Sequence, residues 1–585
     1  MRLTGPPLPP PRHATLVHAL RAAAPHASGV TFVGRDERET FLPWGEVLAR
    51  AEGVAGGLAA RGVAPGDRVA IVLRTEPAFL DAFFGAWLAG AVPVPLYPPV
   101  RLGRLDEYTT STARMLHVSG ARLAVSSGAL RRVLGEAIAR AAPALGDADV
   151  ADLAGPAPAI PEAAPGDLAL VQFSSGSTVD PKPVALRHAA LTAQITALQH
   201  EVDPSDRDAM VSWLPLYHDM GLVGALLGAV SWPGPLALVA PEHFLARPAL
   251  WLRAVARHRG TLSPAPSFAF AYCADRVRDA DLEGCSLASW RFALDGAEPV
   301  SGDALRRFAA RFAPHGLDPA SLVPVYGLSE ATLAVTFSRR GRPLEGRRVD
   351  AVRLARDGVL APGSREIVPV GTPVPGVEVE VRVQAQDGRG TAGLAGEGRL
   401  GRIFVRGPSL LAGYLGDPEG TSRALAGGWL DTGDLGFVAD GALHVHGRAK
   451  DVVIVRGANH APDEFEAALD GVDGLRPGCA VALGHDDGQG EGLVVLAERA
   501  REARAPDAAL ADAIRHAVTE RTGIAPREIR VLAPGTLPRT SSGKLRRQEA
   551  LRRMVAGGLA PPGRGGALAL LGAMARSAVA RWRAP

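Results

Sequence analysis

Apolar positions in the first half of the chain follow two alternating patterns. Five short, nearly continuous apolar runs are typical of buried strands. They lie at residues 67–73, 92–96, 123–126, 168–173 and 236–239. After the first run, apolar residues recur at helical spacing from Phe79 to Leu88. Strands that alternate with amphipathic helices favour crossover connections and a largely parallel sheet. We therefore expect an α/β fold whose large N-terminal domain contains layered sheets and helices.

The pattern changes after two segments rich in Pro and Gly, residues 155–166 and 373–376. From about residue 377 to residue 405, short β-branched runs alternate with Gly, which predicts a small antiparallel, barrel-like piece. The rest of the chain is expected to form a small α+β C-terminal domain.

Composition narrows the function classes. The formal net charge of the 585 residues is 64 − 61 = +3, too balanced for a dedicated nucleic-acid binder. The three cysteines form no CxxC pair, so neither a disulfide framework nor a structural zinc site is expected. The apolar runs are too short for a transmembrane helix, and residues 1–11 lack the apolar core of a signal peptide. We expect a cytoplasmic protein.

Lysine is almost absent from this arginine-rich chain. The only lysines are Lys182, Lys450 and Lys544, and the only asparagine is Asn459. A coding bias against both residue types would explain this depletion. Under that hypothesis, the surviving lysines mark places where a compact point charge is needed and the planar guanidinium of arginine will not serve.

The strongest local signal is a loop of small hydroxyl residues directly after the apolar run that ends at Phe173. Residues 173–184 read FSSGSTVDPKPV. Hydroxyls and backbone amides in such a turn suit a phosphate, and Lys182 would add a positive charge. The spacing is not that of a Walker A loop, and an ordinary Ser/Gly loop would read similarly.

Further segments follow in a fixed order. They are residues 214–221 (LPLYHDMG), 295–299 (DGAEP), 325–332 (VYGLSEAT), 429–436 (WLDTGDLG), 447–451 (GRAKD) and 538–547 (PRTSSGKLRR). Over roughly residues 13–550, this series resembles the adenylate-forming superfamily of acyl-CoA ligases, luciferases and nonribosomal peptide adenylation domains. The exact residues of these motifs are most similar to those of the fatty acyl-AMP ligases. The same is true of residues 453–462 (VIVRGANHAP). That subgroup carries an insertion associated with the choice of a carrier protein over free CoA. Residues 338–366, Arg-rich and expected to be irregular, are the candidate here.

The resemblance implies an ATP site built from several of these segments. Its implied members are Ser174, Ser175, Gly176, Ser177, Thr178 and Lys182 on the β- and γ-phosphates; Gly296, Ala297, Glu298 and Pro299 in the base pocket; Tyr326 on adenine, with Gly327 and Ser329; Asp434 on the ribose hydroxyls; and Arg448 on ribose or phosphate. Glu330 and Thr178 would hold Mg²⁺, a hard ion that prefers oxygen ligands. Taken singly, Glu330 and Asp434 would also fit helix-end and turn positions.

The catalytic residues implied are Lys544, His218 and Glu330. Lys544 would reach the carboxylate and α-phosphate, and His218 would sit where the acyl chain meets AMP. Alone, Lys544 could be a solvated basic residue and His218 a packed histidine. The resemblance also implies a hinge at Lys450, about which the C-terminal domain turns after adenylation to present Gly457. We expect a large domain at residues 1–449, a lid at 450–548 and a basic tail at 549–585.

Two features depart from the family pattern or extend beyond it. Val179 and Pro183 stand where the phosphate loop usually has glycine, and both are less permissive than glycine. Residues 546–585 carry eight arginines against Glu549, a local charge of 8 − 1 = +7. This tail would be a weakly ordered terminus, a weak membrane-surface contact or a docking element for an acidic carrier protein.

These observations lead to one main functional interpretation and two alternatives. The main interpretation is a fatty acyl-AMP ligase that uses ATP and Mg²⁺ to form an acyl-adenylate and passes the acyl group to the phosphopantetheine of a carrier protein in trans. One alternative is an acyl-CoA ligase that uses free CoA. The other is a weakly catalytic protein that binds nucleotide or acyl-AMP, for which Val179 and Pro183 are the only indication. A scaffold that acts through the basic tail is more remote.

Overall fold

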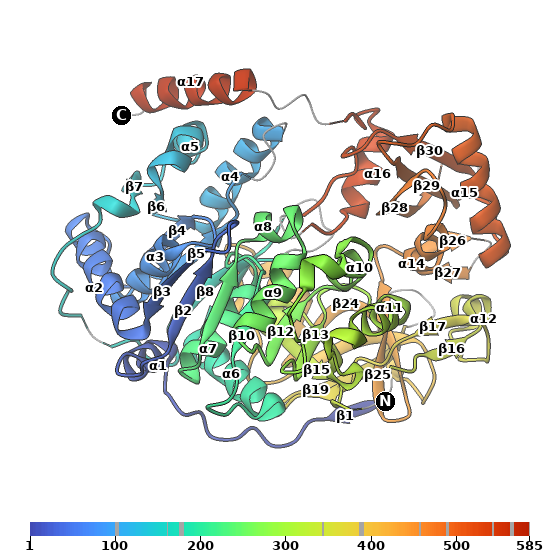
Figure 1. Ribbon diagram of the computed structural model, residues 1–585, viewed down its shortest axis with the longest axis horizontal. Helices are drawn as coiled ribbons and strands as arrows, with labels where there is room; N and C mark the ends of the chain where they lie inside the picture. The colour runs from blue at the N-terminus through green and yellow to red at the C-terminus, as the bar shows by residue number, and fades with distance from the viewer. Residues whose placement is uncertain are drawn as a thin grey trace.

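The computed structural model in Figure 1 shows a large body of sheets and helices, with a smaller C-terminal unit beside it. It describes residues 1–99, 104–160, 162–174, 181–341, 344–384, 391–455, 458–486, 491–540, 543–561 and 567–583. The predicted fold class is confirmed. Within these ranges, no helix is both long and apolar enough to cross a bilayer.

The first sheet is parallel, as the apolar pattern predicts. Its strand order is β5-β4-β6-β7, formed by Val92–Leu96, Arg68–Val72, Leu123–Ser126 and Asp147–Asp149. Its connecting helices are α3 (Pro77–Leu88), α4 (Leu105–Ser119) and α5 (Gly128–Ala141). The buried faces of α3 and of α2 (Trp44–Ala60) pack together, which explains the apolar spacing from Phe79 to Leu88.

The apolar run at residues 168–173 does not join a parallel sheet. It forms β8 (Leu168–Phe173), which pairs antiparallel with β9 (Pro183–Arg187), and β9 pairs in turn with the short β22 (Gly413–Tyr414). The predicted phosphate loop therefore connects two strands of a hairpin. An apolar run shows that a strand is buried on both faces, but not the direction of its neighbour.

The largest sheet has nine strands. Its order is β18 (Thr372–Pro373), β15 (Ala334–Phe337), β14 (Leu322–Gly327), β13 (Phe292–Asp295), β12 (Leu262–Ala265), β10 (Met210–Ser212), β11 (Leu236–Val239), β2 (Gly29–Val33) and β3 (Glu39–Pro43). The strands from β14 to β2 run parallel, and antiparallel strands close both edges.

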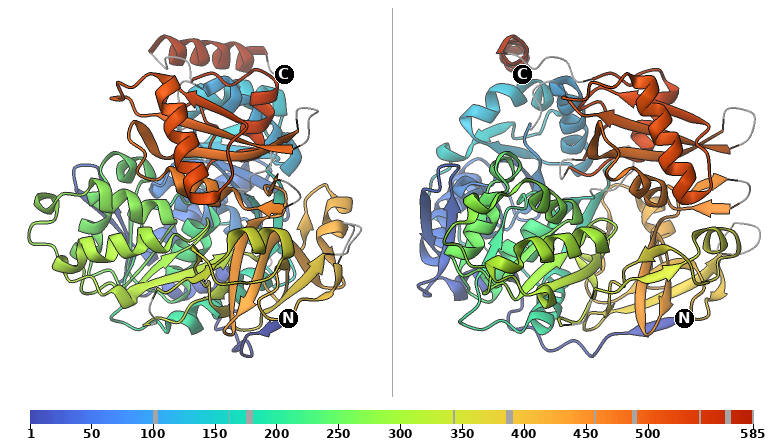
Figure 2. Two further views of the ribbon diagram at one scale, coloured as in Figure 1. Left: turned by 90° about the vertical axis from the view of Figure 1, so that its right-hand side faces the viewer. Right: turned by 45° about the vertical axis from the view of Figure 1, so that its right-hand side comes forward.

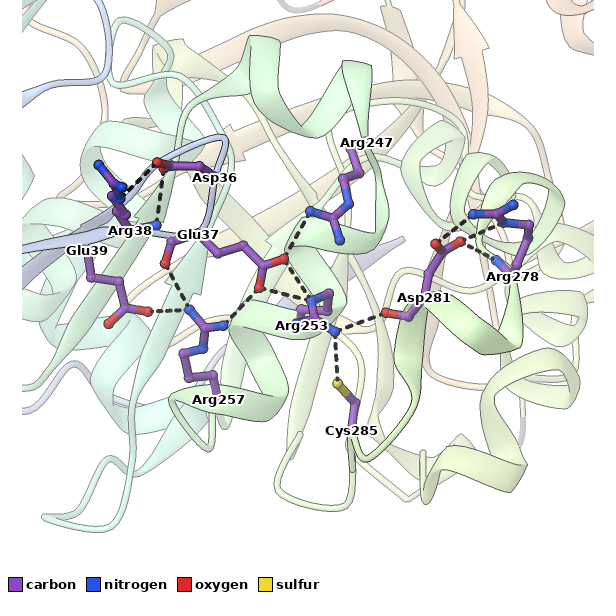
Figure 3. Close-up of polar contacts among 10 residues, drawn as sticks. All are labelled: Asp36, Glu37, Arg38, Glu39, Arg247, Arg253, Arg257, Arg278, Asp281 and Cys285. Atoms are coloured by element: carbon purple, nitrogen blue, oxygen red, sulfur yellow. Dashed lines mark hydrogen bonds and ion pairs between the residues drawn. The ribbon is translucent and has the colours of Figure 1, made fainter.

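Three arginines hold the turn between β2 and β3 against the helices α8 (Pro241–Ala246) and α9 (Ala249–Arg257). Glu37 occupies this turn with a positive φ of 64°. Its carboxylate accepts hydrogen bonds from Arg247, Arg253 and Arg257, as Figure 3 shows. Charge-assisted bonds of this kind offset the strain of a left-handed non-glycine residue.

The expected barrel-like piece is a separate antiparallel sheet. Strands β19 (Glu378–Gln384), β20 (Thr391–Leu394) and β21 (Gly401–Arg406) pair antiparallel, which confirms the pattern at residues 377–405. The long strands β24 (Trp429–Ala439) and β25 (Ala442–Arg448) extend this sheet. They carry Asp434 and Arg448 as directly paired residues.

The C-terminal unit has its own apolar core. It contains the hairpin β26 (Val453–Val455) and β27 (Ala458–His460), the sheet β28 (Leu475–Asp486), β29 (Glu491–Arg499) and β30 (Glu528–Leu532), and helices α14 (Pro462–Glu466), α15 (Asp507–Thr522) and α16 (Arg547–Val555). Its core residues include Phe465, Ile514 and Met554. Figure 2 shows the unit resting on the body. The expected tail boundary at residue 548 falls inside α16.

The candidate insertion, residues 338–366, is more regular than expected. Its described part contains β16 (Arg347–Val349), which pairs with β17 (Arg365–Ile367), and the helix α12 (Ala351–Asp357). Leu354 and Val349 pack against Phe437 and explain this order. Helix α12 lies against β27 of the C-terminal unit.

The end of the basic tail forms helix α17 (Ala567–Arg583), which packs on α5 above the first sheet (Figure 1). The Ser577 hydroxyl accepts a hydrogen bond from the Gly135 amide at 2.6 Å, and Arg576 pairs with Asp106 at 2.8 Å. The tail arginines whose side chains are described all interact with other groups of the chain; they are Arg546, Arg547, Arg552, Arg553 and Arg576. The tail is therefore folded back on the N-terminal region, where Arg553 and Arg576 are paired, whereas Arg547 and Arg552 pair with Glu466 and Glu549 of the C-terminal unit.

Candidate functional site

One cavity of about 830 Å³ between the body and the C-terminal unit collects nearly all the described residues of the predicted site. Its lining includes Ser174, Lys182, His218, Ala297, Glu298, Pro299, Tyr326, Gly327, Ser329, Glu330, Asp434, Arg448 and Lys544. Gly296 lies next to this lining. Ser175, Gly176, Ser177, Thr178 and Val179 lie outside the described residues, as does Gly457. Segments that are far apart in sequence thus meet at one place.

The base of the phosphate hairpin is held by backbone pairing. The Ser174 amide donates to the Lys182 carbonyl at 2.9 Å, and the Lys182 amide donates to the Ser174 hydroxyl at 3.2 Å. Pro183 begins β9, a strand position where a missing amide is tolerated, and its carbonyl accepts from Leu415. This departure from glycine is therefore accommodated by the strand.

Tyr414 links the loop lysine to the predicted metal ligand. The Lys182 ammonium lies 4.2 Å from the centre of the Tyr414 ring, and the Tyr414 hydroxyl lies 3.0 Å from Glu330 Oε1. Burial, followed by the Glu330 charge, raises the pKa of Tyr414, so its hydroxyl remains a donor. Sequence reasoning missed Tyr414; its place in the short run GYLGDP gives no chemical signal by itself.

The opposite end of the polar lining is built on Asp434. Its Oδ2 accepts a hydrogen bond from the Tyr326 hydroxyl at 2.6 Å, and its Oδ1 lies 2.8 Å from Arg448 Nε. The side chain is buried. Each carboxylate oxygen has a second lone pair, so Asp434 can accept two further hydroxyl hydrogens. The Asp434 charge is the main cause that raises the pKa of Arg448, whereas burial is the main cause that raises that of Tyr326.

Close backbone approach explains other residues of these motifs. A Cβ on Gly327 would lie 1.8 Å from the Leu333 carbonyl oxygen, so only glycine fits there. Ala297 and Thr332 both have a φ of +71°, a strained region for residues with a side chain. The Glu298 carboxylate accepts from the Phe268 amide at 2.6 Å.

Lys544 reaches the cavity from a tight loop of the C-terminal unit. The Thr540 amide donates to the Lys544 carbonyl at 2.7 Å, and the Lys544 amide donates to the Thr540 hydroxyl at 3.1 Å. Burial lowers the pKa of Lys544, while the charges of Asp219 and Glu298 oppose that shift. The lysine thus carries its charge into a partly dehydrated space.

His218 and Ser329 both contact Asp219, a residue to which no motif assigned a role. His218 Nδ1 lies 2.7 Å from Asp219 Oδ1, and the Ser329 hydroxyl donates to Asp219 Oδ2. Ser329 therefore uses its hydroxyl within the protein, whereas the sequence placed it on the nucleotide. The His-Asp pair in residues 214–221 was the available signal for Asp219.

The cavity also has an apolar arm between the helix α6 (His188–Val202) and the π-helix η3 (Met220–Leu227). Its lining includes Ile195, Leu198, Val202, Gly224, Gly228, Trp232 and Leu333. Gly228 follows η3 directly, and a Cβ added there would meet nothing closer than 3.8 Å. These residues were not predictable, because they come from separate elements.

The connection between body and C-terminal unit runs past the same cavity. Lys450 is exposed, and its carbonyl accepts from Gln548 Nε2 at 3.0 Å. On the insertion side, Arg365 Nη2 lies 2.9 Å from Asp463 Oδ2 in α14. On the other side, Arg553 of α16 pairs with Glu107 of α4 at 2.8 Å. The C-terminal unit is therefore held against the body from both sides.

Comparison with known proteins agrees with this arrangement. The model of the AMP-binding enzyme family matches residues 20–415. A putative acyl-CoA synthetase of Caulobacter vibrioides is 36% identical, over 93% of this chain and 96% of the relative. The long-chain-fatty-acid–AMP ligase FadD26 of Mycobacterium marinum is 33% identical, over 88% of this chain and 91% of the relative. A solved structure of fatty acyl-adenylate ligases from E. coli and L. pneumophila superposes with a TM-score of 0.87 at 33% identity, and the match covers 93% of this chain and 98% of that one. The chain belongs to the family of AMP-binding enzymes.

Proposed function

We propose that the chain is a fatty acyl-AMP ligase, which joins a fatty acid to AMP and then transfers the acyl group to the phosphopantetheine thiol of a separate carrier protein. The observation that carries this proposal is the single cavity in which a polar, charged end and an apolar arm meet beside Lys544. Relatives named as fatty acid–AMP ligases support the same assignment.

In the first reaction, a carboxylate oxygen of the fatty acid attacks the α-phosphorus of ATP, the bond to the β-phosphate breaks, and pyrophosphate leaves. Several negative charges meet, so catalysis depends on charge neutralisation and positioning. Lys544 supplies positive charge near the reacting atoms. Lys182 and the loop of residues 174–178 hold the β- and γ-phosphates.

The nucleoside end has its own residues. Asp434 accepts the ribose hydroxyls through its remaining lone pairs, and Arg448 keeps that carboxylate in place. Tyr326 lies beside the adenine, and residues 296–299 line the base pocket. The hydrogen bond from Tyr326 to Asp434 fixes the position of the ring.

Mg²⁺ fits the phosphate end of the cavity. Glu330 is a half-buried carboxylate in the cavity lining, and its Oε1 accepts the hydrogen bond from Tyr414. It would hold the ion together with Thr178 and the phosphates, and the ion would supply charge neutralisation there. Tyr414 orients the Glu330 carboxylate for this task.

The fatty acid occupies the apolar arm. Burying each methylene of an acyl chain contributes roughly 0.8 kcal/mol, so an arm lined by aliphatic side chains and Trp232 favours long or medium chains over short acids. The carboxylate end then lies near His218 and Lys544.

Transfer to the thiol is the second half of the proposal. The C-terminal unit, residues 450–548 with the helix α16 that completes its core, turns about Lys450 and withdraws Lys544. Two rigid bodies joined by a short connection are suited to such a turn. The insertion touches the C-terminal unit through Arg365, which supports a role in restricting that movement and in the choice of thiol.

One experiment tests the proposal. Purified protein is incubated with ATP, Mg²⁺ and a series of fatty acids, with a holo-carrier protein, with CoA or with neither, and the products are identified by mass spectrometry. We expect acyl-AMP and loaded carrier with little acyl-CoA. Abundant acyl-CoA would favour the second candidate, an acyl-CoA ligase, which the name of the Caulobacter relative supports. Absence of acyl-AMP with every acid would contradict both.

A further inference from the structure

One ring nitrogen of His218 contacts a carboxylate, and the other has no hydrogen-bond partner among the residues that the structure describes. Nδ1 lies 2.7 Å from Asp219 Oδ1. Nε2 is buried and has no hydrogen-bond partner among the residues that the structure describes. His218 itself lines the cavity. A carboxylate oxygen cannot donate when ionised, so Nδ1 carries the proton of the neutral ring and Nε2 keeps its lone pair.

Asp219 is held in place and stays ionised. Its Oδ1 also accepts the Met220 amide at 2.7 Å, and its Oδ2 accepts the Ser329 hydroxyl. The side chain is buried, which alone would raise its pKa. The interaction with His218, the hydrogen bond from Ser329 and the charge of Lys544 together hold that pKa well below its usual value.

The two half-reactions make different demands on a base. Attack by a carboxylate on ATP releases no proton. Attack by a thiol on an acyl-adenylate forms a carbon–sulfur bond, breaks the carbon–oxygen bond to AMP and releases the thiol proton. Of the buried side-chain nitrogens without a partner, only Gln199 Nε2 and His218 Nε2 belong to described residues that line the cavity. An amide nitrogen is not basic, so of these two nitrogens only His218 Nε2 can accept a proton.

We propose that Asp219, held by Ser329, is a positioning residue that fixes the ring of His218 so that Nε2 takes the thiol proton during acyl transfer. Asp219 then stabilises the imidazolium that forms, and AMP departs with the electron pair of the broken bond. This inference rests on the proposed function, and it assigns Ser329 to the support of Asp219. It applies equally to a carrier thiol and to CoA, because both lose the same proton.

Other charged groups line the same cavity from the surrounding elements. They include Lys182 of the hairpin, Glu298 after β13, Glu330 of the short helix after β14, Arg448 of β25 and Lys544 of the C-terminal unit. These groups are the same in a variant that changes only Asp219. A comparison of Asp219→Asn with the unchanged protein therefore isolates the effect of one carboxylate charge.

The test separates the half-reactions. Adenylation is followed by pyrophosphate exchange, and transfer is followed in a single turnover from purified acyl-AMP and carrier protein between pH 7 and pH 9. For Asp219→Asn we expect transfer to fall about 100-fold at pH 7, the lower end of the range for general-base catalysis, while adenylation changes less than about threefold. The deficit in transfer should shrink toward pH 9, because the thiol then ionises without a base.

Controls exclude a merely structural effect. In the double variant of Asp219→Asn and His218→Gln, transfer should be no slower than in His218→Gln alone, because Asp219 acts through His218. Asp208→Asn serves as the matched control: Asp208 is also buried and paired with an arginine, Arg291, but does not line the cavity. Asp208→Asn should leave both half-reactions unchanged.

The outcomes are distinct. Equal losses in both half-reactions, a deficit that does not vary with pH, or additive effects of the two substitutions would each overturn the inference. Failure of the unchanged protein to form acyl-AMP or to transfer it would instead count against the proposed function, because that measurement does not depend on any substitution.

Discussion

The Tyr414 hydroxyl donates to Glu330 across 3.0 Å, although 84 residues separate the two in the chain. The bond joins the strand β22, next to the phosphate hairpin, to the segment that follows β14. The same tyrosine ring lies under the Lys182 ammonium. The position of the Glu330 carboxylate therefore depends on a residue outside every recognised motif.

The Tyr414→Phe variant tests this dependence. Phenylalanine keeps the ring beneath Lys182 and removes only the bond to Glu330. A hydrogen bond to a charged group contributes roughly 1.5 kcal/mol, so the rate of adenylation at limiting Mg²⁺ should fall about tenfold. Rates are compared by pyrophosphate exchange over a series of Mg²⁺ concentrations, where saturating Mg²⁺ should restore part of the loss. Tyr272→Phe, which removes a hydroxyl bonded to the Leu245 carbonyl, is the control and should have no effect.

Gly228 should set the length of acid that the apolar arm admits. A leucine there would extend into the cavity without a backbone clash at Cβ, and overpacking costs roughly 1–3 kcal/mol. For Gly228→Leu we expect activation of palmitate to fall about 10- to 100-fold, with activation of hexanoate nearly unchanged. Adenylate yields from a chain-length series provide the measurement. Gly53→Leu, in α2 with open space around it, is the control; equal losses for both acids would contradict the prediction.

Arg365 should restrict the use of CoA. It bridges the insertion to Asp463 of the C-terminal unit, and its loss should free that unit without removing the Val349 and Leu354 contacts that stabilise the insertion. We expect Arg365→Gln to raise acyl-CoA formation about tenfold, the effect of roughly 1.4 kcal/mol. The matched control is Arg347→Gln in the same hairpin, which breaks only an exposed pair with Asp440. An unchanged ratio of acyl-CoA to loaded carrier would show that this contact does not govern the thiol.

His188 should make the fold sensitive to acid. Burial lowers its pKa to about 4, and the nearby Asp167 opposes this shift only in part. The unfolded chain binds a proton near pH 6.5, so stability that is complete above that pH is lost as the pH falls toward 4. The loss is roughly 2 kcal/mol by pH 5. In His188→Gln the free energy of unfolding, measured in urea at pH 7.5 and pH 5, should fall less between the two pH values. An identical fall in both proteins would contradict the assignment.

The sequence predicted where strands and helices occur better than it predicted which strands pair with one another. Apolar spacing located β4, β5, β6 and β11, because a buried strand requires a run of apolar residues that is visible in the local sequence. It could not show that β8 turns back on β9, since pairing direction depends on residues far away. The insertion was expected to be irregular, whereas Leu354 and Phe437 give it a small core that no local pattern reveals.

The site residues also divide into those that the sequence could predict and those that it could not. Lys182, Glu330, Asp434 and Lys544 were recognisable because each stands in a motif, and the structure brings them to one cavity. Tyr414 and the walls of the apolar arm were not, because their relevance arises from contacts among separate elements. Ser329 stood in a motif but bonds to Asp219, since a hydroxyl takes whichever acceptor the fold places nearest.

Helix α17 gives the C-terminal unit a second connection to the N-terminal region, covalent from α16 to α17 and noncovalent from α17 to α5 and α4. Eleven residues, 556–566, connect α16 to α17, and a fully extended chain of that length spans roughly 37 Å. While Ser577 and Arg576 keep α17 on α5 and α4, no rotation can carry the end of α16 farther than this from the start of α17. The length of a connecting segment, rather than any residue of the cavity, thus sets an upper limit on the conformations that the enzyme can sample.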